Sequence, residues 1–202
     1  GNFALHGLLG FDMHGKTAGI IGTGKIAKIL IQILKGFGMN ILAYDLYPDN
    51  NFAREHQVVY TSLDELYHSS DIISLHCPLT EQTKYLINDY SISKMKDGVM
   101  IINTGRGQLI HTNALIEGLK NKKIGSAGLD VYEEEGDYFY EDKSDRIIDD
   151  DVLARLLSFN NVIVTSHQAF FTHEALENIA STTLQNIKDF AENKSLANEV
   201  KV

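Results

Sequence analysis

Short apolar runs alternate with amphipathic stretches along most of this chain. Residues 72–75 and 100–102 are almost continuously apolar, which is typical of parallel strands covered on both faces. The pattern predicts strands near 17–22, 40–45, 58–60, 71–77, 99–104, 124–131 and 161–167, and helices near 25–37, 63–69, 88–96, 112–122 and 149–158. This alternation predicts an α/β fold with a doubly wound parallel sheet of the Rossmann type and right-handed crossovers.

The two ends of the chain depart from this alternation. Residues 1–16 are rich in glycine and predict no regular element, whereas residues 173–193 carry apolar side chains at helical spacing. We therefore expect a sheet domain over 17–168, preceded by the segment 1–16 and followed by a C-terminal part, 169–202. The apolar face of the long helix must pack on the sheet domain or on a second lobe.

Composition and charge narrow the possible classes of protein. The 202 residues are 44% hydrophobic and 22% charged, which suits a soluble globular domain. The longest apolar runs are too short to span a bilayer, and no secretory signal is visible, so we expect no membrane partner. Because Cys77 is the single cysteine, a reducing, cytoplasmic location is expected.

The negative charge of the chain is concentrated in one segment. Of the net charge of −9, residues 133–151 contribute −8, with ten acidic and two basic side chains. No basic stripe follows from the remaining sequence, so we do not expect nucleic acid as a partner.

A glycine-rich turn follows the first predicted strand and opens the first predicted helix. In Gly22-Thr-Gly-Lys-Ile-Ala27, Gly22 permits a tight turn and Gly24 lets backbone N–H groups approach a pyrophosphate. Ala27 supplies the small residue that close helix–strand packing needs. Asp45 ends the next strand, where its carboxylate accepts hydrogen bonds from a ribose hydroxyl and repels a 2′-phosphate. This combination predicts dinucleotide binding and favours NAD over NADP.

Polar side chains occur at the carboxyl ends of the later strands, where doubly wound sheets bind ligands. Reduction of a 2-keto acid requires a cation for the carboxylate, a proton donor for the carbonyl and a group that keeps the donor protonated. One Arg, a cluster of Glu and one His at three strand ends offer these groups. Taken alone, this pattern is equally compatible with ordinary loop polarity.

Five segments, in order, resemble the signatures of the D-2-hydroxyacid dehydrogenases. They are 22–27 with Asp45, Ser74-Leu-His-Cys-Pro-Leu-Thr80, Asn103-Thr-Gly-Arg-Gly107, Gly128-Leu-Asp-Val-Tyr-Glu133 and Ser166-His-Gln-Ala-Phe170. Residues 1–7, 137–144 and 167–172 are similar to the branch of the family that contains the fermentative D-lactate dehydrogenases. The resemblance implies an NAD-dependent enzyme that reduces pyruvate to D-lactate and forms a homodimer.

The resemblance also implies roles for individual residues. Arg106 would bind the substrate carboxylate, His167 would be the acid/base group, and Glu135 would be its carboxylate partner, with Glu133 as the alternative. Phe170 would line the substrate pocket. The implied cofactor contacts are Gly22, Gly24, Lys25, Ile26, Asp45, Cys77, Pro78, Thr83, Thr104, Gly105, Arg106 and Asp130; no metal site is implied.

Two positions depart from the family pattern, and the sequence leaves two roles possible for His76. Ala27 stands where glycine is usual, and Gly105 stands where serine is common, which puts in doubt any role for that hydroxyl but not for Arg106. His76 lies near the nicotinamide side or is a hydrogen-bonded structural histidine.

The resemblance begins at the end of an interlobe segment, residues 1–16. The family's N-terminal substrate lobe is therefore expected to lie outside these 202 residues, and 169–202 is expected to belong to that lobe. We expect the chain by itself to bind NAD and to turn over pyruvate poorly or not at all. The alternatives are a dehydrogenase of another 2-hydroxy acid, or a non-catalytic scaffold that senses NAD.

Overall fold

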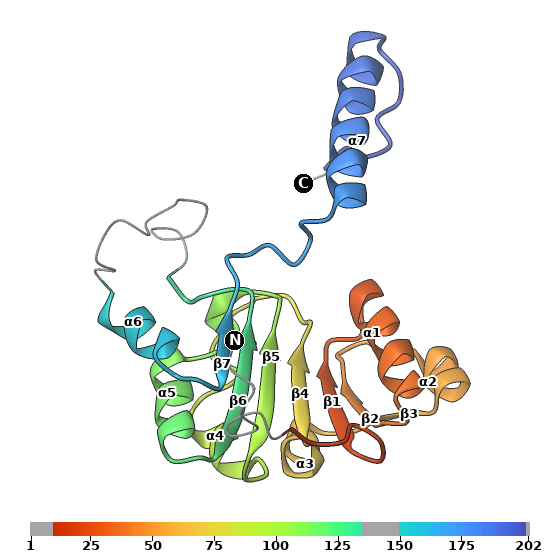
Figure 1. Ribbon diagram of the computed structural model, residues 1–202. Coiled ribbons are helices and arrows are strands. Elements are labelled where there is room, and N and C mark those ends of the chain that lie inside the picture. The colour runs from red at the N-terminus through yellow and green to blue at the C-terminus, as the bar shows by residue number, and fades with distance from the viewer. Residues whose placement is uncertain (1–9, 135–149, 201–202) are drawn as a thin grey trace, which may run out of the picture. The chain divides into compact units, whose positions relative to one another are not determined.

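The computed structural model describes residues 10–134 and 150–200. The chain consists of two compact units, Gly1–Ser166 and His167–Val202 (Figure 1). The predicted boundary between the sheet domain and the C-terminal part, at residue 168, lies two residues beyond Ser166. The assignment of these parts to lobes of a larger enzyme stays a prediction.

The first unit is built on a seven-stranded parallel sheet with strand order β3-β2-β1-β4-β5-β6-β7 (Figure 1). The predicted doubly wound α/β fold is therefore confirmed. Its elements are β1 (Thr17–Ile21), α1 (Lys25–Gly36), β2 (Asn40–Tyr44), α2 (Asn50–His56), β3 (Val58–Tyr60), α3 (Leu63–Ser69), β4 (Ile72–Leu75), α4 (Asp89–Lys94), β5 (Val99–Asn103), the short 3-10 helix η1 (Gly107–Leu109), α5 (Thr112–Lys120), β6 (Ile124–Leu129), α6 (Asp151–Leu157) and β7 (Val162–Val164).

Strand β1 lies inside the sheet, between β2 and β4. Ile21, its last residue, is paired with Tyr44 of β2 and with Leu75 of β4. The chain builds outward from β1 to β2 and β3 in one direction and then to β4 through β7 in the other. The switch point therefore falls between β1 and β4, at the carboxyl edge of the sheet, where this class of fold binds ligands.

Helix α1 covers one face of the sheet at β1 and β2. Its buried residues Ala27, Ile31 and Leu34 are spaced by four and three positions, so they lie on one stripe. They pack with strand residues of β1 and β2, and Phe52 of α2 is packed against the same cluster. The helix ends at Gly36, and Gly38 adopts a left-handed φ of +75°, which favours glycine.

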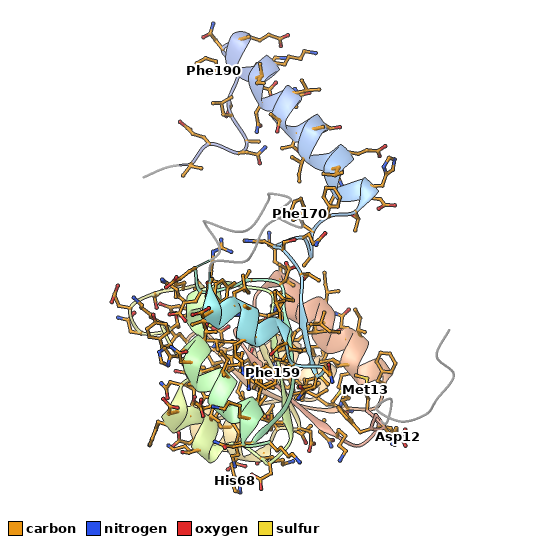
Figure 2. The ribbon with its side chains drawn as sticks, turned by 60° about the vertical axis from the view of Figure 1, so that its left-hand side comes forward. Asp12, Met13, His68, Phe159, Phe170 and Phe190 are labelled. Carbon is orange, nitrogen blue, oxygen red and sulfur yellow. The ribbon has the colours of Figure 1, made fainter. Side chains whose placement is uncertain are left out.

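The other face carries the larger core. Buried side chains of α3, α4, α5 and α6 form one cluster with those of β1, β4, β5 and β6. Leu66 and Leu115 are among its large, fully buried members. Phe159, which follows α6 (Figure 2), is partly buried against this cluster. The guanidinium of Arg155 lies over its ring, 5.2 Å from the ring centre.

The sequence pattern missed one helix. Helix α2, Asn50–His56, has seven residues and none of them is buried, so it leaves no apolar periodicity to detect. Its start is fixed by Asp49, whose side chain accepts hydrogen bonds from the backbone N–H groups of Asn51 and Phe52. The short η1 was also not predicted, and most elements of the structure are shorter than their predicted ranges, by one to three residues at an end.

An apolar cavity of about 430 Å³ lies on the α1 side of the sheet. Strand residues Ile72, Met100 and Ile102 form part of its wall, together with Phe11 and Met13 from the segment before β1.

In the described part of the chain, no helix combines the length and the apolar character that a membrane crossing requires.

The second unit consists mainly of α7 (His173–Ala191), as predicted for 173–193 (Figure 1). Thr172 caps its N-terminus by accepting a hydrogen bond from the N–H of Ala175 at 3.2 Å. The apolar side chains of Leu184, Ile187 and Phe190 are exposed, and Phe190 lies close to the C-terminal end of the helix (Figure 2).

Candidate functional site

The glycine-rich turn after β1 is held against the end of β4. Gly22 has a φ of +89°, and a Cβ atom there would lie 2.5 Å from the backbone nitrogen of Cys77. Only glycine combines this backbone conformation with this close approach. Gly24 differs, because a Cβ atom added there would meet no atom within 4 Å. The turn is therefore packed at its first glycine and open at its second.

The open side of this turn fits the pyrophosphate of a dinucleotide. Gly24 is the N-cap of α1 and supplies no side-chain cap, and the first turn of the helix contains no acidic residue. Lys25 and Ile26 are exposed beside it. An uncapped helix N-terminus attracts anions through its N–H groups and the helix dipole, and Lys25 adds a positive charge.

Asp45 lies directly after β2 and is bound to the glycine-rich turn. Its Oδ2 accepts hydrogen bonds from the backbone N–H of Thr23 at 2.6 Å and from the Thr23 hydroxyl at 2.8 Å, and its Oδ1 accepts one from the N–H of Tyr47 at 2.8 Å. Partial burial opposes the charged form, but these hydrogen bonds outweigh it and lower the pKa of Asp45. The site therefore holds an ionised carboxylate beside the turn.

Further polar groups extend this arrangement, and the sequence did not point to them. The Thr23 hydroxyl lies 2.9 Å from the phenol oxygen of Tyr60, and that oxygen accepts a hydrogen bond from the N–H of Asp49 at 3.1 Å. Asp49 is paired with Lys28 of α1 at 2.5 Å. Tyr60 ends β3, so only the strand order, which places β3 beside β2, would have revealed it.

The segment after β4 is folded back on itself. The Thr83 hydroxyl donates to the carbonyl of Pro78 at 2.7 Å and accepts from the N–H of Thr80 at 2.7 Å. Burial raises the pKa of the Cys77 thiol, which keeps the thiol neutral. His76 forms a hydrogen bond with the Ser74 hydroxyl at 2.8 Å, and burial lowers the pKa of its imidazole. These contacts favour a structural role for His76 over a position near the nicotinamide.

Arg106 is presented by a loop that Asn103 shapes. Asn103 is buried, and its side chain accepts from the N–H of Gly105 at 3.0 Å and donates to the carbonyl of Arg106 at 2.9 Å. Arg106 itself is exposed, and its Nη1 donates to the Gly105 carbonyl at 2.8 Å. None of the ion pairs among the described residues involves Arg106, so its guanidinium offers donors to an external carboxylate.

The residues after β6 are tied to the neighbouring loops. Asp130 is 4% exposed; its N–H donates to the Asn103 carbonyl at 2.9 Å, and its Oδ1 accepts from the Thr165 hydroxyl. Glu133 accepts hydrogen bonds from the Tyr85 phenol at 2.5 Å and from the N–H of Thr112 at 3.1 Å. Both Glu133 oxygens are therefore engaged.

The predicted cofactor residues all follow strands that end at one edge of the sheet. Gly22, Gly24, Lys25, Ile26, Asp45, Cys77, Pro78, Thr83, Thr104, Gly105, Arg106 and Asp130 all lie in segments that follow strands β1, β2, β4, β5 and β6. Among the described residues, no group of three or more His, Cys, Asp or Glu side chains is arranged to hold a metal ion.

The three predicted catalytic residues do not lie in one unit of the structure. Arg106 lies in the first unit, Glu135 lies outside the described residues, and His167 is the first residue of the second unit. His167 has a left-handed φ of +52°. Phe170 also belongs to the second unit (Figure 2). Its ring forms an edge-on contact with the ring of Phe171. The convergence of Arg106, Glu135 and His167 therefore stays a prediction.

Comparison with known proteins gives the chain a family. Residues 1–169 match the family described as D-isomer specific 2-hydroxyacid dehydrogenase, NAD binding domain. The chain is 54% identical over 199 residues to the D-lactate dehydrogenase of Escherichia coli (strain K12). The aligned residues make up 98% of this chain and 60% of that enzyme. It is 49% identical over 190 residues to the aromatic 2-oxoacid reductase of Clostridium sporogenes, which covers 94% of the chain and 57% of that protein.

A solved structure of the pyruvate reductase of Chlamydomonas reinhardtii superposes with a TM-score of 0.93 at 46% identity, covering 98% of this chain and 60% of that one. The chain thus spans about 60% of the length of the relatives that it matches. Because the family match covers most of the chain and the glycine-rich turn fits a dinucleotide, this chain belongs to the D-2-hydroxyacid dehydrogenases and carries the NAD-binding domain of that family.

Proposed function

We propose that this chain is part of an NAD-dependent D-lactate dehydrogenase that reduces pyruvate to D-lactate. The observation that carries the proposal is the exposed guanidinium of Arg106. It lies on the same edge of the sheet as the glycine-rich turn and has no acidic partner among the described residues. Relatives about half identical to the chain include a D-lactate dehydrogenase, which supports the same substrate.

Arg106 is proposed to bind the substrate carboxylate and to polarise the adjacent carbonyl. The planar guanidinium can donate two parallel hydrogen bonds to a carboxylate, which fixes the orientation of a small keto acid. Asn103 supports this role, because it holds the backbone on both sides of the arginine. The substrate is thereby positioned by a group whose own loop is fixed.

His167 is proposed to donate a proton to the carbonyl oxygen in the direction of reduction and to accept it in the reverse direction. Glu135 is proposed as the carboxylate partner of this imidazole. Phe170 is proposed to line the substrate pocket. When bound, NADH supplies the hydride that reduces the carbonyl carbon, so pyruvate, NADH and one proton give D-lactate and NAD⁺.

The cofactor is proposed to lie along the carboxyl edge, with its pyrophosphate at Gly22–Ile26 and a ribose hydroxyl on Asp45. Cys77, Pro78, Thr83, Thr104, Gly105 and Asp130 are proposed as further contacts. The ionised Asp45 favours NAD, because a 2′-phosphate placed beside it would be repelled.

The remaining expectations concern the larger assembly. Residues 169–202 are proposed to belong to the substrate lobe, and the exposed apolar side chains of α7 support a packing role there. The homodimer and the cytoplasmic location stay predictions; light scattering after gel filtration tests the first.

The experiment that tests the proposal is an NADH oxidation assay with pyruvate and a panel of larger keto acids. It is performed on the protein that includes the substrate lobe and, in parallel, on the 202-residue chain. We expect turnover of pyruvate only by the longer protein and NADH binding by both. His167→Ala in the longer protein should lower kcat by a factor of a hundred or more, in the range of general acid–base catalysis, with little change in NADH affinity.

Three results would each count against part of the proposal. Robust pyruvate turnover by the 202-residue chain would show that the substrate lobe is not needed. Unchanged kcat in His167→Ala would remove His167 from the mechanism. Absence of turnover by the longer protein, with intact NADH binding, would favour the NAD-sensing scaffold.

A second candidate is a dehydrogenase of a bulkier 2-hydroxy acid. The observation in its favour is the 49% identity to the aromatic 2-oxoacid reductase of Clostridium sporogenes, which is close to the 54% shared with the E. coli enzyme. The ratio of kcat/KM for pyruvate to that for an aromatic keto acid decides between the two, since that ratio measures discrimination directly.

A further inference from the structure

Five residues in and after β1, β2 and β3 are linked in series, through four hydrogen bonds and the Asp49 residue itself. The series runs from the Asp45 carboxylate to the Thr23 hydroxyl, the Tyr60 phenol, the N–H of Asp49 and, through the Asp49 carboxylate, to Lys28. The links measure 2.8, 2.9, 3.1 and 2.5 Å in that order. Three neighbouring strand ends are thereby joined at the glycine-rich turn.

The direction of every hydrogen bond in this series follows from its two ends. The ionised Asp45 carboxylate can only accept, so the Thr23 hydroxyl donates to it. The backbone N–H of Asp49 can only donate, so the Tyr60 oxygen accepts from it. The Tyr60 hydroxyl is then left to donate to the Thr23 oxygen. All donors point towards Asp45, and such aligned chains strengthen their members.

The far end of the series is fixed as well. Asp49 caps α2 by accepting hydrogen bonds from the N–H groups of Asn51 and Phe52, and its other oxygen is paired with Lys28. Tyr60 therefore receives its hydrogen bond from a residue that two helices hold in place. Because the N–H of Asp49 is fixed, it restrains the position of the Tyr60 hydroxyl, and that hydroxyl in turn restrains the Thr23 side chain.

The consequence at Asp45 is that its two oxygens are no longer equivalent. Oδ2 accepts both hydrogen bonds from Thr23, whereas Oδ1 accepts the N–H of Tyr47. An ionised carboxyl oxygen accepts about two hydrogen bonds, so Oδ2 is filled. Oδ1 is then the oxygen that remains for a ribose hydroxyl.

We propose that Tyr60 is a positioning residue for the cofactor, which acts through Thr23 to fix the rotation of the Asp45 carboxylate. This inference rests on the proposed function, in which Asp45 binds the ribose of NAD. A fixed carboxylate presents Oδ1 to the ribose hydroxyl of NADH and cannot turn away from the 2′-phosphate of NADPH. Tyr60 therefore contributes both to NADH affinity and to discrimination against NADPH.

The test is a direct titration of NADH and NADPH by nicotinamide fluorescence with the 202-residue chain, which contains no tryptophan to interfere. Tyr60→Phe removes only the hydroxyl. We expect the Kd for NADH to rise about fivefold, the loss that corresponds to one hydrogen bond, while the Kd for NADPH rises less. Tyr90→Phe makes the same chemical change on the exposed surface of α4 and should leave both Kd values unchanged.

A second pair of variants separates positioning from a general loss of structure. Thr23→Val keeps the shape and the backbone N–H of Thr23 and should reproduce the effect of Tyr60→Phe. In an Asp45→Ala background, Tyr60→Phe should have no further effect on NADH binding, because the carboxylate that it positions is gone. Circular dichroism of each variant verifies the fold, and Thr23→Val carries the test if Tyr60→Phe does not fold.

Two outcomes overturn the inference. In the first, the unmodified chain binds NADH, and Tyr60→Phe has the same Kd for NADH and the same Kd for NADPH as the unmodified chain. In the second, Tyr60→Phe weakens NADH binding by the same factor with and without Asp45. Failure of the unmodified chain to bind NADH is a different result, and it contradicts the proposed function itself.

Discussion

Tyr85 donates its phenolic hydrogen bond to Oε1 of Glu133, a residue 48 positions further along the chain, at 2.5 Å. Tyr85 has a left-handed φ of +52°, and its N–H donates to the carbonyl of Gln108 at 2.8 Å. Its ring also meets the imidazole of His111 edge-on. Tyr85 thus joins three loops that follow β4, β5 and β6, all of which contain proposed cofactor residues.

This contact bears on the choice between two glutamates for the proposed partner of His167. Glu133 was the alternative to Glu135, but its oxygens serve Tyr85 and the first N–H of α5. A carboxylate at that helix N-terminus is favoured by the uncapped N–H groups and by the helix dipole. Glu133 is therefore accounted for as a structural residue, which supports Glu135 as the proposed partner.

The first prediction is that Tyr85→Phe lowers the free energy of unfolding by about 1 kcal/mol at pH 7, the usual net value of one hydrogen bond. Urea denaturation followed by circular dichroism measures it. Tyr90→Phe, which removes a hydroxyl from the exposed surface of α4, serves as the matched control. Equal unfolding free energies for the Tyr85→Phe variant and the unmodified chain would show that the Tyr85–Glu133 contact is not stabilising.

The same contact predicts a dependence on pH. Partial burial opposes the charged form of Glu133, but the hydrogen bonds from Tyr85 and Thr112 outweigh it and lower its pKa from the ordinary value of 4.5. A group whose pKa is lowered by folding stabilises the folded state above its unfolded pKa and loses this contribution as the pH falls. The difference between Tyr85→Phe and the unmodified chain should therefore shrink below about pH 4.5.

The second prediction contrasts the two glycines that flank Arg106. A Cβ atom at Gly105 would lie 3.4 Å from a methyl carbon of Leu109, an ordinary contact, whereas one at Gly107 would lie 1.9 Å from the carbonyl oxygen of Tyr132. Gly105→Ala should change stability by no more than about 1 kcal/mol, with stabilisation expected from the lower entropy of the unfolded chain. Gly107→Ala should cost more than about 3 kcal/mol.

Thermal unfolding of the two glycine variants, measured side by side, tests this contrast. Comparable melting temperatures would contradict the close approach of the Arg106 loop to Tyr132. The result also bears on the departure at position 105, where serine is common in the family. Space for a Cβ atom there means that the missing hydroxyl reflects no steric restriction.

The third prediction concerns His76, which is expected to be neutral at pH 7. Burial lowers the pKa of its imidazole below the ordinary 6.5, and its Nε2 is hydrogen-bonded to Ser74 at 2.8 Å. Since the unfolded chain takes up this proton first, the stability of the fold should fall as the pH drops below 6.5. An NMR titration should give a midpoint below 6.5 for His76. A midpoint above 6.5 would instead indicate a nearby anion.

Local sequence patterns were sufficient for the elements that have a clear period or a fixed backbone requirement. Strands β4 and β5 are near-continuous apolar runs, and Gly22 and Asp45 stand at the positions that a dinucleotide turn demands. The sequence pattern did not predict helix α2, because its seven residues bury no side chain and its start depends on a single cap, Asp49. Such an element has almost no periodic signal.

Contacts between distant segments were beyond the reach of sequence patterns. Tyr60 reaches Thr23 because β3 lies beside β2, and β2 beside β1, an order that the apolar runs do not specify. Tyr85 reaches Glu133 because the loops after β4 and β6 meet across β5. The resemblance to a family supplied Arg106, Glu135 and His167, but it gave no information on these supporting residues.

The last prediction tests the role of Arg106 in the protein that includes the substrate lobe. Arg106→Lys keeps the positive charge but loses the planar fork that can bind a carboxylate through two hydrogen bonds. The loop should retain its shape, because Asn103 holds it through the backbone atoms of Gly105 and Arg106. We expect kcat/KM for pyruvate to fall about a hundredfold, or about 2.7 kcal/mol of transition-state stabilisation, with far less change in the Kd for NADH. Arg155→Lys, on the exposed side of α6, is the matched control and should leave both quantities unchanged. If Arg106→Lys retained full kcat/KM, charge alone would account for substrate binding, and the proposed paired hydrogen bonds to the carboxylate would be wrong.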